Sequence, residues 1–128
     1  MVAYYLLGTE EFRDECGRFW RAANHVTAPA SWEAEVTNVL WMAVRKQVLT
    51  LPEAVGKLDL ALSLGIHSVP VAQLWQGALA RACTTSIAAY DTLFVELAVR
   101  EQLPMVTFDQ VVLRAFPAIA CLPAGLLA

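Results

Sequence analysis

Apolar and polar positions along this chain follow helical spacing in the longer segments and form continuous apolar runs in the shorter ones. The helical patterns cover residues 9–24, 32–47, 51–64, 72–83, 87–101 and 109–116. The short apolar runs cover residues 25–29, 66–71, 104–108 and 118–122. Short apolar strands that alternate with helices predict an α/β fold, in which a short parallel sheet is covered by helices on both faces.

Several residues mark where these helices begin and end. Ser31 is predicted to cap the helix 32–47, and Thr50 with Glu53 forms a capping-box pair for the helix 51–64. That helix is expected to stop at Gly65, because glycine readily adopts the left-handed conformation that ends helices.

The composition narrows the class of protein. A chain of 128 residues is expected to form one domain, residues 1–128, and 58% hydrophobic residues predict a large core or interface. A net charge of −3 favours neither nucleic acid nor membrane, and no apolar run reaches the ~18 residues of a membrane span. The N-terminus lacks the features of a signal peptide. Three cysteines without a Cys-x-x-Cys pair indicate reduced thiols, mostly in the core, and a cytoplasmic protein.

Three acids stand out by their surroundings. Asp91 lies in an apolar helix with no Lys or Arg within four positions, so its charge needs a partner. A nearby helix N-terminus or a hydroxyl such as that of Ser86 is the structural alternative. Asp109 follows a strand directly, where an α/β fold places its site, although an ordinary N-cap explains it more readily. Glu35 falls on the border of the apolar stripe of its helix and points either into a cleft or to water.

Three segments in the right order resemble the PIN-domain family, and most closely the bacterial VapC-like toxins. "APASWEAEVTNVL" is similar to the family's strand and helix with E-x-x-N-x-L, and "SIAAYDTLFVELA" to its Y-D-A helix. "LPMVTFDQVVLRAF" is similar to its strand followed by T-x-D-x-x-L. The resemblance covers nearly the whole chain and implies a PIN-like three-layer α/β/α fold with a short parallel sheet.

The resemblance also implies an activity, that of a metal-dependent endoribonuclease. Glu35, Asp91 and Asp109 would be its catalytic residues and would hold Mg²⁺ or Mn²⁺, whose preferred ligands are carboxylate oxygens. Thr107 matches the hydroxyl that supports the last acid. Asn38 is a candidate to orient Glu35, although an ordinary exposed amide explains it slightly better. The implied partners are an RNA substrate, an antitoxin protein that plugs the acidic cleft, and a second copy of the chain in a homodimer.

One part of the family pattern has no counterpart in this sequence. The family's central first strand ends in an Asp and precedes an apolar helix similar to "VAYYLLG", with which this chain opens. We therefore expect a sheet whose central first strand is truncated, with unpaired backbone groups on two neighbouring strands. The missing Asp favours an alternative function, that of a catalytically impaired PIN-fold module that binds antitoxin or RNA. A third possibility is an unrelated α/β domain in which the acids are helix caps.

Other residues permit simpler interpretations. Arg45 and Lys46 end the helix of Glu35, where cations favour the helix dipole, and phosphate contact is an equal alternative. His25 and His67 match no catalytic or metal motif. The tryptophans have no interleaved basic residues, which favours packing in the core or at a dimer interface over base stacking; they are Trp20, Trp32, Trp41 and Trp75.

Overall fold

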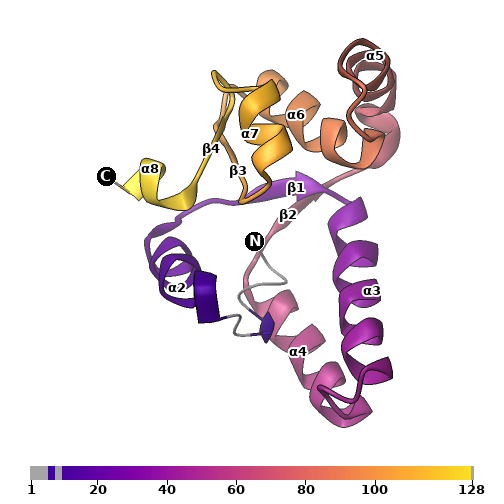
Figure 1. The fold of residues 1–128 in the computed structure, drawn as a ribbon, viewed down its shortest axis with the longest axis vertical. Helices are drawn as coiled ribbons and strands as arrows, with labels where there is room; N and C mark the ends of the chain where they lie inside the picture. Colours follow the sequence, from indigo (N-terminus) through magenta and orange to yellow (C-terminus); the bar gives the residue numbers. More distant parts are fainter. Residues whose placement is uncertain (1–5, 8–9, 128) are drawn as a thin grey trace.

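Short parallel strands lie among a larger number of helices in the computed structural model, which describes residues 6–7 and 10–127 (Figure 1). The N-terminal half contains η1 (Glu10–Phe12), α2 (Arg13–Ala22), β1 (Thr27–Pro29), α3 (Ser31–Arg45) and α4 (Leu51–Ser63). The C-terminal half contains β2 (His67–Val69), η2 (Val71–Gln73), α5 (Trp75–Thr85), α6 (Ala89–Glu101), β3 (Met105–Val106), α7 (Gln110–Ala115), β4 (Ala120–Cys121) and α8 (Pro123–Leu127). The predicted mixed α/β class is confirmed.

The strands form two separate parallel pairs. β1 pairs with β2, with Thr27 opposite His67, and β3 pairs with β4, with Met105 opposite Ala120. The predicted parallel pairing is therefore confirmed, whereas a continuous sheet is not formed by the described residues. Most of the segment "VAYYLLG" (residues 2–8) lies outside the described residues. The described residues therefore do not test the expectation that the first strand is truncated.

The helix ends agree with the predictions in one case and differ in another. Thr50 Oγ1 accepts a hydrogen bond from the Glu53 N–H, the Glu53 carboxylate accepts one from the Thr50 N–H, and Gly65 has a positive φ of 67°. The prediction that Ser31 caps α3 is wrong. Ser31 is the first residue of the helix, because the turn already begins at Ala30, whose backbone is helical. The short helix α8 was not predicted from the pattern.

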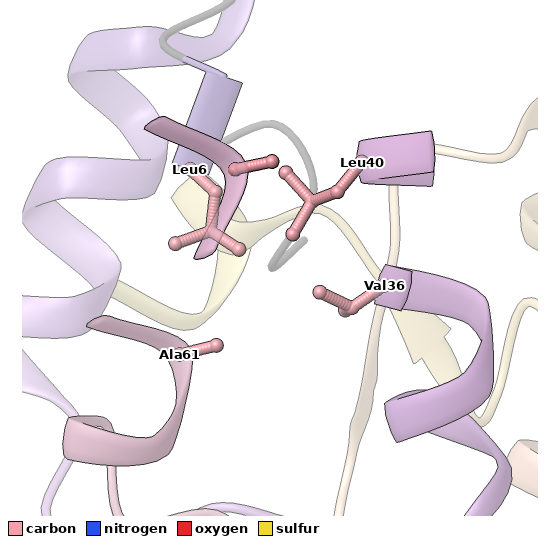
Figure 2. Close-up of a cluster of buried hydrophobic side chains, with 5 residues drawn as sticks. Leu6, Val36, Leu40 and Ala61 are labelled. Carbon is pink, nitrogen blue, oxygen red and sulfur yellow. The ribbon is translucent and has the colours of Figure 1, made fainter. Parts of the chain in front are cut away.

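Three clusters of buried side chains hold the helices together. In the first, Val36 and Leu40 of α3 point toward Leu6 and toward Ala61 of α4 (Figure 2). The second lies where α6 and α7 pack on β3 and β4, around the fully buried Val95. The third joins α5 to α6. Because α6 takes part in two clusters and also contacts β1, it is the central helix of the fold.

No single helix in the described ranges is long and apolar enough to cross a membrane. Helices α5 and α6 pass such a test only when they are joined, and they are bent by 118° at their junction.

Candidate functional site

Glu35, Asp91 and Asp109 line one pocket with a volume of about 740 Å³. Glu35 lies in the second turn of α3, Asp91 lies in the first turn of α6, and Asp109 directly precedes α7. These acids come from three elements that are far apart in the sequence. The structure thus brings the three acids singled out in the sequence to a common cavity.

The charges of these acids influence one another. Burial raises the pKa of Asp91, and the nearby carboxylate of Asp109 raises it further. Burial also raises the pKa of Glu35, and the negative charge of Asp91 adds to that effect. Asp91 is half-buried, whereas Glu35 and Asp109 keep much of their surface exposed. Because each shift disfavours the ionised form, the pocket is a place where a cation would relieve repulsion between carboxylates.

Asp109 is also the N-cap of α7. Its Oδ1 accepts hydrogen bonds from the N–H groups of Val111 (2.8 Å) and Val112 (3.1 Å). Its own N–H donates to Thr107 Oγ1 at 3.1 Å. The capping interpretation is therefore correct, but both cap bonds use Oδ1, and a carboxylate has a second oxygen with which it can bind a ligand.

The buried acid of α6 is Glu96, not Asp91. The side chain of Glu96 is only 11% exposed, and its two oxygens pair with Arg81 Nε at 2.9 Å and Arg100 Nε at 2.8 Å. Asp91 lies in the first turn of α6 and is only half-buried, so its carboxylate is nearer to solvent than its place in an apolar helix indicated. Hydrogen bonds from Arg81 above all, with those from Arg100, hold the pKa of Glu96 below its ordinary value.

Of the supporting residues predicted from the sequence, only Thr107 lies at the pocket. Thr107 lines the pocket and bonds to the backbone of Asp109. Asn38 is exposed, lies one helical turn beyond Glu35 and does not line the pocket. Arg45 and Lys46 are exposed at the far end of α3, about 15 Å along the helix axis from Glu35. Arg45 lies over the ring of Trp41 instead, 5.5 Å from its centre.

Aromatic side chains form much of the remaining pocket wall. They are Phe19, Trp20, Trp32, Phe94 and Phe108, with His25 beside them. Trp32 is fixed by a 2.8 Å hydrogen bond from its Nε1 to Ser68 Oγ, which in turn donates to Glu33. Trp32 lies three residues before Glu35 on the same helix, and residues at this spacing share a helix face. This spacing was the one signal in the sequence that could have placed Trp32 in the pocket wall.

For the other two tryptophans the structure excludes one of the two predicted places, the core. Trp41 and Trp75 are 55% and 58% exposed, so neither packs in the core of this chain. Both lie on helix faces that no described element covers. Packing at a dimer interface therefore stays a prediction for both.

The donor set of the pocket suits a hard divalent cation. Carboxylate oxygens are the ligands that Mg²⁺ and Mn²⁺ prefer, and the acids here are destabilised by one another's charge. Across the described ranges, no group of three or more His, Cys, Asp and Glu side chains is arranged closely enough to hold a metal ion already. The residue types therefore fit the ion, while the three acids do not form a closed ligand set.

No protein-family model matches this chain, and no curated protein matches its sequence.

Proposed function

We propose that this protein is a metal-dependent endoribonuclease with a PIN-like three-layer fold, the toxin of a bacterial toxin–antitoxin pair. One observation carries the proposal: Glu35, Asp91 and Asp109, each within a motif that resembles this family, line the same pocket. Separate elements supply the three acids, so chance proximity within one helix does not account for their meeting.

Glu35, Asp91 and Asp109 would hold Mg²⁺ or Mn²⁺, and the bound ion would supply charge stabilisation at an attacked phosphate and an activated water. Because burial and repulsion raise the pKa of Asp91 and Glu35, these carboxyl groups can hold a proton more readily than exposed acids do. Thr107 fixes the backbone at Asp109. The aromatic wall, with Trp32 and Phe108, offers flat surfaces on which RNA bases can stack.

An exposed apolar stripe supports the proposed protein partners. Leu51, Val55, Leu58 and Leu62 follow one another along α4 at spacings of four, three and four residues, and all four are exposed. This spacing is that of a helix seam that packs against another helix. The stripe is compatible with a homodimer and with an antitoxin helix.

Cleavage of a mixed-sequence RNA in the presence of Mn²⁺ tests the proposal. The native chain should cleave, and chelation with EDTA should abolish cleavage. Asp91→Asn should reduce the rate at least 100-fold, because it removes a charge from the ligand set without changing the shape of the side chain. Glu101→Gln, an exposed acid at the other end of the same helix, is the matched control and should cleave as the native chain does.

A catalytically impaired binding module is the second candidate. The aromatic side chains of the pocket wall, which include Trp32 and Phe108, favour it because they would bind RNA without cleaving it. A native chain that binds RNA in a gel-shift assay but leaves it intact with either Mg²⁺ or Mn²⁺ would establish this alternative and exclude the nuclease.

A further inference from the structure

The side chain of Trp32 lines the pocket with its ring and directs its polar edge elsewhere. Its Nε1–H, the one hydrogen-bonding group of an indole, donates to Ser68 Oγ at 2.8 Å. Ser68 lies in β2 and does not line the pocket, whereas Trp32 does. The pocket therefore meets the carbon surface of the indole, which suits a flat ring better than a group that needs a hydrogen bond.

A second hydrogen bond fixes this orientation of the indole. The Ser68 hydroxyl donates to Glu33 Oε1 at 3.1 Å, so its lone pairs are left to accept the indole N–H. The last torsion of a tryptophan side chain has two broad minima, and turning the ring over would carry Nε1 away from Ser68. The indole is thus held in place before any ligand binds, which lowers the entropic cost of stacking on it.

Trp32 lies beside the acids of the pocket. It precedes Glu35 by three residues in α3, a spacing at which Cβ atoms are about 5–6 Å apart. Asp91 and Asp109 line the same pocket. A base that stacks on Trp32 would therefore bring a phosphate of its own nucleotide close to these carboxylates.

The charges of the pocket make such stacking more important for binding. Of the described residues that line it, none is Lys or Arg, and three are acids. Lysine and arginine contacts to phosphates, which supply much of the affinity of most nucleic-acid-binding proteins, are therefore not offered by this part of the pocket wall. Stacking of bases on aromatic rings, together with the proposed metal ion, is left to supply affinity.

We infer that Trp32 is the stacking surface for one RNA base next to the cleaved phosphate, and that Ser68 and Glu33 are positioning residues that hold its ring. These roles rest on the proposed function, since they require that the pocket binds RNA. Ser68 lies outside the pocket, so its effect on RNA binding is transmitted through the Trp32 N–H.

Binding of a short oligoadenylate labelled with fluorescein tests the stacking surface. Fluorescence anisotropy gives its Kd for the full chain in EDTA, where metal-dependent cleavage does not interfere. The matched control oligonucleotide has the same phosphates but carries tetrahydrofuran spacers in place of its nucleosides, and so has no bases. It should bind at least 10-fold more weakly, because stacking on the aromatic wall is lost. Equal binding of both oligonucleotides would overturn the inference, even if the protein variants fail to fold.

A double-mutant cycle tests the positioning residues. Ser68→Ala should raise the Kd of the oligoadenylate about 5-fold, the factor that corresponds to one hydrogen bond of average strength. Ser68→Thr keeps the hydroxyl and should bind as the native chain does. Trp32→Phe keeps a ring but has no N–H, so in that background Ser68→Ala should change Kd by less than about 2-fold. Ser63→Ala, the control, removes a hydroxyl that bonds only within α4, to the Leu60 carbonyl, and should leave Kd unchanged.

The outcomes distinguish these roles from the proposed function. An equal effect of Ser68→Ala in both backgrounds would overturn the positioning role, because Ser68 would then act without the Trp32 N–H. A native chain that binds neither oligonucleotide would overturn the stacking role and the RNA function together. A native chain that prefers the oligoadenylate but leaves RNA intact with Mn²⁺ would support the stacking role and exclude the nuclease. Where cleavage occurs, Ser68→Ala should raise KM and leave kcat unchanged, as expected for a loss of binding alone.

Discussion

Gly77 of α5 lies directly against the carboxyl group of Glu96 of α6, so that a Cβ at position 77 would overlap the carboxyl carbon and both oxygens. Two arginines hold that carboxylate and prevent it from moving aside. We predict that Gly77→Ala lowers the free energy of unfolding by about 1–3 kcal/mol, although alanine is the better helix former. Urea unfolding monitored by circular dichroism measures the change.

A second helical glycine provides the control for this prediction. Gly56 lies in α4, and a Cβ there would meet no atom within 4 Å. Gly56→Ala should therefore raise the free energy of unfolding by about 0.5–1 kcal/mol. If both variants were stabilised equally, the close contact between Gly77 and Glu96 would be disproved.

The ion pairs of Glu96 should make the stability of the fold depend on pH. Arg81, followed by Arg100, lowers the pKa of Glu96 in the fold below its ordinary value of 4.5. An acid with a lowered pKa stabilises the fold above its unfolded pKa, and this contribution is lost as the pH falls through the lower, folded value. Glu96→Gln should lower stability at pH 7 by about 2 kcal/mol, since it leaves two arginines without their charged partner.

Thermal melts between pH 7 and pH 3 provide the measurement. The difference in Tm between the native chain and Glu96→Gln should shrink as the pH falls below about 4.5. A difference that stays constant over this range would mean that the charge of Glu96 is not what stabilises the contact between α5 and α6.

Asp91 should have the opposite effect on the metal-free protein. Burial and the charge of Asp109 raise its pKa, so its ionised form costs stability at pH 7, and that cost disappears as the pH falls. Asp91→Asn should raise the free energy of unfolding by about 0.5 kcal/mol, the scale of a partly solvated charge pair. Added Mn²⁺ should raise the Tm of the native chain and not that of the variant.

The outcome of that experiment also separates two roles of Asp91. A variant that is less stable than the native chain without metal would show that Asp91 makes a structural contact, and it would remove Asp91 from the proposed ligand set. Melts in EDTA and in Mn²⁺, recorded for the same preparations, make the comparison direct.

Local periodicity was sufficient to predict the longer helices, but it did not identify the partners of the charged side chains. The pattern of residues 87–101 indicated a helix with an acid among apolar neighbours, and it suggested Asp91. The pattern did not show that Arg81 of the preceding helix lies across from Glu96, because the angle between α5 and α6 depends on tertiary packing. The spacing of Glu96 and Arg100, four residues apart, was the local signal that pointed to the correct acid.

The site itself required more than periodicity. Each of the three acids, taken alone, was explained at least as well by a cap or a border position, and Asp109 is indeed a cap. Only the order of the three motifs indicated that the acids belong together. The aromatic wall was not predicted, since Trp20 and Trp32 face the pocket through the packing of α2 and α3 rather than through any pattern within either helix.

Asp109 combines a structural and a proposed chemical role, and two substitutions separate them. Asparagine caps helices as well as aspartate does, so Asp109→Asn should keep the bonds to Val111 and Val112 and change the free energy of unfolding by less than about 0.5 kcal/mol. Asp109→Ala loses the cap and should cost about 1 kcal/mol. Both variants should lose RNA cleavage with Mn²⁺ at least 100-fold, because each removes the negative charge. If Asp109→Asn retained cleavage while Asp109→Ala lost it, the carboxylate would serve α7 alone, and the proposed metal site would have to exclude it.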